Sequence, residues 1–284
     1  MTRRTLLFGG LAAGCRAGAE PSGLVSLAPS LTELICAIGA AAQLRGVSTW
    51  CQHPTEILSL PRCGSSFTPD FEAIKRLRPE LILCSGSSVS WQLSGSRVEC
   101  LEQATLPRLL DSFDHAGRLL SQAAAALRER RKLEDALEAC RQRAAPAPRT
   151  SVLLLLNPLS DSGAVPQVCA ASRNDGYFTP LLTSCGLDNL LDHPLTYPLL
   201  GPEQLRRLNP ARILVLAVGF TAAQKAQELA SWQRFKSLSA VKTGAIHLLT
   251  GDHVNVPGPR LPLLLADFER VRLPAASVPG VLSL

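Results

Sequence analysis

Apolar residues recur at helical spacing through one long stretch in the middle of the chain, residues 112–147. The steps between them alternate between four and three residues, and Arg130 is the one charged residue on this stripe. The stripe consists of Leu119, Ala123, Ala126, Leu133, Leu137, Cys140 and Ala144. Pro146 and Pro148 end the pattern. It predicts one amphipathic helix of about thirty residues, roughly 45 Å long.

A second pattern occurs twice, once on each side of this predicted helix. Residues 71–83 and 202–214 each contain a glutamate followed by Ile or Leu at +2, Arg at +4, Leu at +5 and Pro at +7. Each copy predicts a short helix, ended by proline, that leads into a buried strand. The duplication indicates two similar lobes. One large domain with an ordinary surface helix is the alternative, because helix-loop-strand units recur throughout α/β proteins.

Elsewhere, short apolar runs alternate with helical patterns, which is typical of α/β proteins. Strands are expected at residues 23–27, 44–47, 81–84, near 109, and at 151–156, 213–218 and 245–249. Helices are expected at residues 31–38, from the 80s to about 104, and at 177–185, 221–238 and 261–271. Ser30 and Glu33 have the spacing of a capping box for the first helix.

The predicted fold class is therefore α/β, with two Rossmann-like lobes that each contain a central sheet and are joined by one long rigid helix. We expect residues 23–111 to form the N-terminal lobe, 112–148 the helix and linker, and 149–272 the C-terminal lobe. Residues 1–22 would be a leader and residues 273–284 a loose tail. A chain of 284 residues can bury one large core or two medium ones.

Charge and hydropathy exclude two classes of protein. The net charge of +6 would suit a nucleic-acid binder, but the Lys and Arg residues are scattered among 23 acidic ones. We therefore expect no nucleic-acid partner. After the first residues, no run of 18 apolar residues occurs, so no transmembrane helix is expected.

The first residues have the features of an export signal: Arg3 and Arg4, an apolar stretch over residues 6–13, and then small residues. Residues 11–15, Leu-Ala-Ala-Gly-Cys, resemble a bacterial lipobox, which would make Cys15 a lipidated N-terminus. Residues 17–19, Ala-Gly-Ala, offer an ordinary signal-peptidase site instead. Either cleavage places the protein in the periplasm or on the outer face of the cytoplasmic membrane. No cysteine or histidine spacing predicts a metal site.

Several motifs, taken in their order and spacing, carry a resemblance to a known family. They are Leu-Ala-Pro-Ser-Leu-Thr-Glu at 27–33, Gly-Val-Ser-Thr-Trp-Cys-Gln-His-Pro at 46–54, Leu-Pro-Arg-Cys-Gly at 60–64, the pattern at 71–83, and Pro-Gly-Pro-Arg at 257–260. The chain resembles the periplasmic substrate-binding proteins of ABC importers for cobalamin, haem and iron-siderophores. The resemblance implies two lobes on a stiff helix and a non-enzymatic monomer without a cofactor. It also implies a corrinoid or iron chelate as cargo, and a membrane permease with its ATPase as partners.

The resemblance also assigns roles to residues. Glu72 and Glu203 align with the acidic residues that dock onto permease arginines. The alternative is that both are glutamates stabilised by their position near a helix N-terminus. Trp50 and Tyr197 take the places of aromatic residues that hold the ligand, one on each lobe; a packed loop anchor and a turn residue are the alternatives. Ser66 and Ser85 stand where the family can carry tryptophan. Cobalamin is the favoured ligand.

Other ligands and other classes stay open. Haem would need an axial ligand, for which Tyr197, His53, His193 and His253 are candidates. An anionic ferric siderophore would need cleft arginines, for which Arg173 and Arg260 are candidates. A thiol-dependent enzyme using Cys51 and His53 lacks an orienting acid or amide, and no phosphate-binding glycine motif occurs. An adhesin or scaffold without a small ligand is a further alternative.

Overall fold

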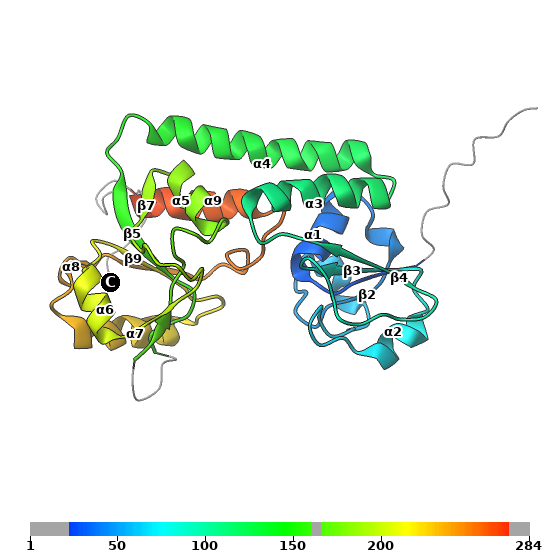
Figure 1. Ribbon diagram of the computed structural model, residues 1–284, viewed down its shortest axis with the longest axis horizontal. Coiled ribbons are helices and arrows are strands. Elements are labelled where there is room, and N and C mark those ends of the chain that lie inside the picture. The colour runs from blue at the N-terminus through cyan, green and yellow to red at the C-terminus, as the bar shows by residue number, and fades with distance from the viewer. Residues whose placement is uncertain (1–22, 161–165, 273–284) are drawn as a thin grey trace, which may run out of the picture.

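A computed structural model describes residues 23–160 and 166–272 and shows two α/β lobes, which confirms the expected fold class (Figure 1). The N-terminal lobe contains a four-stranded parallel sheet with the strand order β2-β1-β3-β4. Its strands are β1 (Leu24–Ser26), β2 (Leu44–Val47), β3 (Leu81–Ser85) and β4 (Arg97–Leu101). Its helices are α1 (Pro29–Ala37) and α2 (Phe71–Leu77), with 3-10 turns at Ala41–Gln43 and Thr55–Ser59.

The C-terminal lobe has a second four-stranded parallel sheet, in the order β10-β9-β5-β7. Its strands are β5 (Thr150–Leu155), β7 (Leu187–Asn189), β9 (Ile213–Leu216) and β10 (Ile246–Leu249). A small antiparallel ladder pairs β6 (Val168–Cys169) with β8 (Leu199–Leu200). The helices are α5 (Phe178–Ser184), α6 (Pro202–Leu208), α7 (Ala222–Ser231), α8 (Ser239–Lys242) and α9 (Leu261–Arg272), with a 3-10 turn at Trp232–Phe235.

The duplicated sequence pattern has the same structure in both lobes. It forms α2 and β3 in the first lobe and α6 and β9 in the second. Both strands are inner strands: β3 lies between β1 and β4, and β9 lies between β10 and β5. Each helix ends at a residue in the left-handed conformation, Arg78 (φ 46°) or Asn209 (φ 42°), directly before a proline. The left-handed residue donates its N–H back to the last turn, and the proline cannot continue the helix.

The prediction of a single helix over residues 112–147 is wrong. The chain forms two helices there, α3 (Leu106–Leu119) and α4 (Ala123–Ala144), which lie side by side (Figure 1). Ser121, with φ 56°, reverses the chain between them. Gly117 permits the close approach, because a Cβ at this position would lie 2.5 Å from that of Ala126. The apolar stripe continues through the turn because α3 and α4 both bury their apolar residues in the same core. The helix that connects the lobes is α4, about 33 Å long for its 22 residues.

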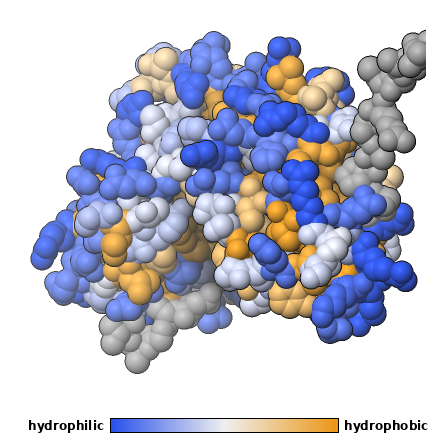
Figure 2. Space-filling model, turned by 45° about the vertical axis from the view of Figure 1, so that its right-hand side comes forward, coloured by the Kyte–Doolittle hydropathy of each residue, from blue (hydrophilic) through white to orange (hydrophobic). Residues whose placement is uncertain are grey.

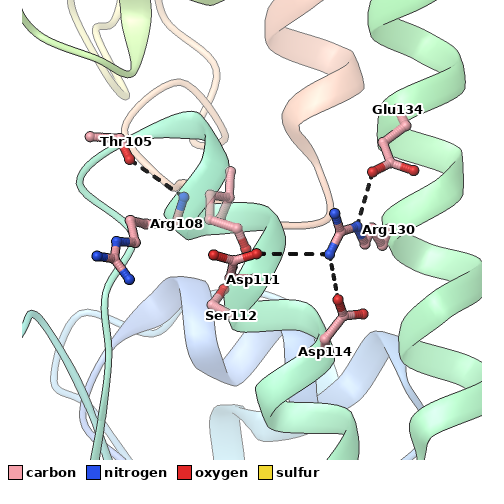
Figure 3. Close-up of polar contacts among 8 residues, drawn as sticks. Thr105, Arg108, Asp111, Ser112, Asp114, Arg130 and Glu134 are labelled. Atoms are coloured by element: carbon pink, nitrogen blue, oxygen red, sulfur yellow. Dashed lines mark hydrogen bonds and ion pairs between the residues drawn. The ribbon is translucent and has the colours of Figure 1, made fainter.

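Arg130, the one charge on the predicted stripe, holds these two helices together (Figure 3). Its guanidinium pairs with Asp114 of α3, lies 3.9 Å from Asp111, and donates from Nε to Glu134 of α4 at 2.9 Å. Three quarters of the Arg130 side chain is buried. The interruption in the hydrophobic pattern is therefore a polar contact between helices.

Three further local predictions are wrong. The helix expected before residue 104 is replaced by strand β4, which follows a turn at Gly95 (φ 85°). The strand expected near Leu109 is part of α3. Ser30 and Glu33 do not form a capping box, because α1 begins at Pro29. The Ser30 hydroxyl instead donates to Oε1 of Gln103 at 2.5 Å, and Glu33 pairs with a distant arginine.

One apolar core runs through both lobes. Helices α1, α3, α4, α5 and α9 form a layer that covers one face of each sheet, and their buried side chains belong to a single cluster. Examples from along this cluster are Leu31, Phe113, Leu133, Leu137, Leu154, Leu181, Leu214 and Phe268. Moving one lobe against the other would expose this packing, so the helical layer holds the lobes at a fixed separation. Among the described residues, no helix combines the length and apolarity needed to cross a bilayer.

Candidate binding cleft between the lobes

Three adjoining hollows lie between the lobes, with volumes of about 340, 290 and 300 Å³. Asn255 lines all three, and its neighbours Val256 and Pro257 each line two. These residues belong to the loop between β10 and α9, which crosses from the C-terminal lobe to contact α1. Figure 2 shows a depression between the two halves of the molecule, with hydrophobic residues exposed along it. The hollows therefore form one cleft, and this loop is its shared wall.

Trp50 projects from the N-terminal lobe into this cleft. It follows the carboxyl end of β2, its side chain is 72% exposed, and it lines one hollow together with Gln52 and His53. The loop that carries it is fixed, because Nη1 of Arg62 donates to the carbonyl oxygens of Ser48 (3.2 Å) and Cys51 (2.8 Å). An exposed ring on a fixed loop rules out the alternative of a packed loop anchor.

Phe67 is a second exposed aromatic residue in the cleft, and it is not among the residues predicted from the sequence. Its side chain is 88% exposed, and it lines the same hollow as Ser85. It stands at the tip of a tight turn, in which Ser65 and Thr68 are hydrogen bonded at 3.0 Å. A large apolar residue inside a run of Ser, Thr and Pro was the available signal for this position.

The two serines at expected tryptophan positions differ. Ser66 is buried; its hydroxyl donates to the Leu27 carbonyl at 3.2 Å and accepts from the Ser85 N–H at 3.0 Å. It therefore offers no free group to a ligand. Ser85 lines the cleft at the carboxyl end of β3.

Tyr197 lies on the opposite side of the cleft, on the C-terminal lobe. Its ring is 44% exposed and lines a hollow with Tyr177, Phe178 and Leu216. Burial of its phenol raises the pKa of Tyr197. Trp50 and Tyr197 thus lie on different lobes, in hollows that share the Asn255 wall.

Neither predicted cleft arginine presents a free guanidinium to the cleft. Arg260 donates to both oxygens of Glu33 on α1, at 2.8 and 2.6 Å, and to Asp252 at 2.7 Å. Arg173 donates from Nε to the Asn189 carbonyl at 2.8 Å and lines none of the three hollows. The arginines expected to hold an anionic siderophore therefore contribute no unpaired charge to the cleft.

Only two of the four candidate axial ligands for haem line the cleft. His53 and Tyr197 line the cleft. His193 and His253 line none of the three hollows: Nδ1 of His193 accepts from the Leu195 N–H at 3.1 Å, and Nε2 of His253 lies 2.8 Å from Asp267. Within residues 23–160 and 166–272, no cluster of His, Cys, Asp or Glu could hold a metal ion.

The structure does not support a thiol nucleophile. Cys51 is buried, and its sulfur lies 3.2 Å from Oγ1 of Thr32. Burial raises the pKa of the Cys51 thiol, so the neutral form is favoured over the reactive thiolate. Its role is packing within the N-terminal lobe.

Glu72 and Glu203 occupy matching positions on the two lobes. Both belong to the first turn of a seven-residue helix, their side chains are 74% and 85% exposed, and each pairs with the basic residue three positions later. Figure 1 shows α2 and α6 on the side of the molecule away from α4. The two helices that carry these glutamates therefore lie on the same side of the molecule, one on each lobe. Cys15, the predicted lipidation site, lies outside the described residues.

Sequence comparisons find relatives that match most of this chain. The vitamin B12-binding protein of Pectobacterium carotovorum subsp. carotovorum (strain PC1) is 27% identical over 206 residues, which cover 69% of this chain and 72% of that protein. An uncharacterized ABC transporter substrate-binding lipoprotein of Bacillus subtilis (strain 168) is 23% identical and covers 85% of this chain and 77% of that protein.

Solved structures share the fold. A periplasmic haem-binding protein from Pseudomonas aeruginosa superposes with a TM-score of 0.77 at 25% identity, over 90% of this chain and 94% of that one. The periplasmic vitamin B12-binding protein of Vibrio cholerae gives 0.73 at 20% identity, over 89% and 96%. Residues 24–252 match the family described as periplasmic binding protein. The chain therefore belongs to the periplasmic binding protein family.

Proposed function

We propose that this protein is the substrate-binding component of an ABC importer, and that it captures a corrinoid in the cleft between its lobes. The observation that carries the proposal is a cleft with exposed aromatic rings on both sides and no unpaired cation among its described lining residues. The relatives named as vitamin B12-binding proteins support this choice.

The aromatic residues suit a broad, flat ligand. Trp50 and Phe67 project from the N-terminal lobe, and Tyr197 from the C-terminal lobe. Rings presented on fixed loops bury a large area of ligand at low entropic cost. Because the shared core holds the lobes apart, the ligand enters a cleft whose width is already set.

The charge of the cleft favours an uncharged macrocycle. Arg260 is neutralised by Glu33 and Asp252. Apart from the His53 imidazole, the other polar side chains that line the cleft are amides and hydroxyls, including Gln52, Asn255 and Ser85. Haem propionates and anionic siderophores would lie here without a free cation, which is unfavourable for a buried carboxylate. The carboxamides of a corrinoid match amide side chains.

Haem is the second candidate ligand. Tyr197 and His53 both line the cleft and provide the oxygen and nitrogen atoms that bind haem iron. The solved haem-binding relative supports it.

Delivery to the membrane would use Glu72 and Glu203 as docking residues. Two exposed carboxylates at matching positions suit a permease with two equivalent basic sites, since charge pairs fix register and increase the rate of encounter. The permease and its ATPase would then supply transport. We place the protein in the periplasm or on the outer face of the cytoplasmic membrane, with Cys15 as its lipid anchor.

The test is calorimetric titration of the purified protein with cyanocobalamin, haemin and a ferric hydroxamate siderophore. We expect saturable one-to-one binding of cyanocobalamin, with much weaker binding of the other two. Tighter binding of haemin would favour the second candidate. Binding of none of the three would favour an adhesin or scaffold.

A further inference from the structure

The hydroxyl of Tyr177 is a buried polar group without a partner. Tyr177 directly precedes α5, its side chain is 6% exposed, and its oxygen makes no hydrogen bond to any described residue. Most buried hydroxyls in proteins are hydrogen bonded, because burial without a partner costs free energy. An exception in the wall of a cleft therefore requires a reason.

Hydrogen bonds hold the backbone at Tyr177, and its ring packs against a neighbouring ring. The Tyr177 N–H donates to Asp175 at 2.7 Å, and the carbonyl of Gly176 accepts from the Leu106 N–H at 2.9 Å. The ring packs edge-on against Phe178, with centroids 4.8 Å apart. Burial also raises the pKa of the Tyr177 phenol, so it stays protonated and able to donate a hydrogen bond.

The hollow that Tyr177 lines contains no charged residue. Its wall consists of Gln103, Ala104, Leu156, Tyr177, Phe178, Tyr197, Leu216, Asn255 and Pro257. Asn255 is exposed, and its amide makes no side-chain hydrogen bond to another described residue. The wall of the hollow thus contains a buried phenol that can donate and an exposed amide that both donates and accepts. A ligand carboxylate would be buried there without a cation, whereas an uncharged carboxamide would not carry this penalty.

We propose that Tyr177 and Asn255 form a subsite for a carboxamide group of the ligand. The Tyr177 hydroxyl donates to the carboxamide oxygen, and Oδ1 of Asn255 accepts from its NH₂. The hydroxyl is covered in the free protein, so binding requires a neighbouring side chain to move, and the half-exposed Tyr197 lines the same hollow. The subsite rests on the proposed function, because a corrinoid carries carboxamides around its rim.

The experiment compares Tyr177→Phe with the wild type, with cyanocobalamin as the probe. Removal of one neutral hydrogen bond should weaken Kd about three- to tenfold. The melting temperature should not fall, because the lost hydroxyl had no partner in the free protein. Ser184→Ala is the matched control: it removes a buried hydroxyl from α5, the helix that Tyr177 precedes, and this hydroxyl donates to the Pro180 carbonyl at 2.9 Å. This control should lower the melting temperature and leave Kd unchanged.

A double-mutant cycle with Asn255→Ala tests whether the two side chains bind one group. The double variant should lose less affinity than the product of the two single losses, because both contacts involve the same carboxamide. An unchanged Kd in Tyr177→Phe overturns the subsite, as does a weaker Kd accompanied by a lower melting temperature, which indicates a structural role. If the wild type fails to bind cyanocobalamin, the proposed function is wrong, and this subsite with it.

Discussion

Glu33 and Arg260 form a two-pronged ion pair between the lobes, with N–O distances of 2.8 and 2.6 Å. Glu33 belongs to α1 of the N-terminal lobe, and Arg260 directly precedes α9 of the C-terminal lobe. Both side chains line the cleft on one side and a separate hollow of about 450 Å³ on the other. The pair therefore closes one end of the cleft and adds a polar contact between the lobes to the shared apolar core.

The first prediction concerns the strength of this contact. Glu33→Gln should lower the free energy of unfolding by about 3 kcal/mol, because it leaves a mostly buried guanidinium without its main partner. Asp252→Asn is the matched control; its side chain is 53% exposed, so the loss should be about 1 kcal/mol or less. Denaturant unfolding of both variants measures the difference. Equal losses would show that the contact between the lobes is no stronger than a surface pair.

The second prediction concerns pH. Burial, and then the charge of Arg212, lower the pKa of His247 below its usual 6.5. The unfolded chain therefore binds a proton more readily than the folded one, so His247 lowers the free energy of unfolding as pH falls from about 7 to 5. His247→Asn should reduce the slope of stability against pH over this interval. An unchanged slope in denaturant unfolding would contradict this assignment.

The third prediction concerns the cleft. Trp50→Ala should weaken cyanocobalamin binding by about 1–3 kcal/mol, because the exposed ring would stack on the ligand. Trp91→Ala is the control. That ring packs edge-on against Phe71, and its N–H donates to the Ser66 carbonyl, so its loss should affect stability rather than Kd. Titration calorimetry distinguishes the two outcomes, and equal Kd values for wild type and Trp50→Ala would remove Trp50 from the site.

The fourth prediction concerns docking. Glu72→Arg combined with Glu203→Arg should abolish corrinoid uptake by cells and leave Kd unchanged, since both side chains are exposed and line none of the three hollows. Glu138→Arg on the exposed face of α4 serves as the control and should transport normally. Lost affinity with intact uptake would refute the assignment.

Local patterns predicted the fold well where one segment contains all the information. The glutamate of each duplicated pattern, its leucine and its proline lie within eight residues, and both copies form the expected helix and strand. The turn at Ser121 was missed because α3 and α4 bury one continuous apolar stripe, so that periodicity does not register the reversal.

The candidate site was less predictable, because its key contacts join distant segments. Glu33 and Arg260 are separated by 227 positions, and nothing in either local pattern indicates the pairing. Exposure of Trp50 followed from its place after a strand, whereas the burial of Ser66 depends on hydrogen bonds to β3 and to the residue after β1. The role of the 250–260 loop as the shared wall became visible only from the packing of the lobes.

A crystal structure of the protein with cyanocobalamin bound tests the central claim most directly. We predict that the corrin ring lies between Trp50 and Tyr197, with the lobes at their present separation and the Glu33 to Arg260 ion pair intact. A ligand bound outside the cleft, or a large rotation of the lobes that breaks this ion pair, would contradict the account.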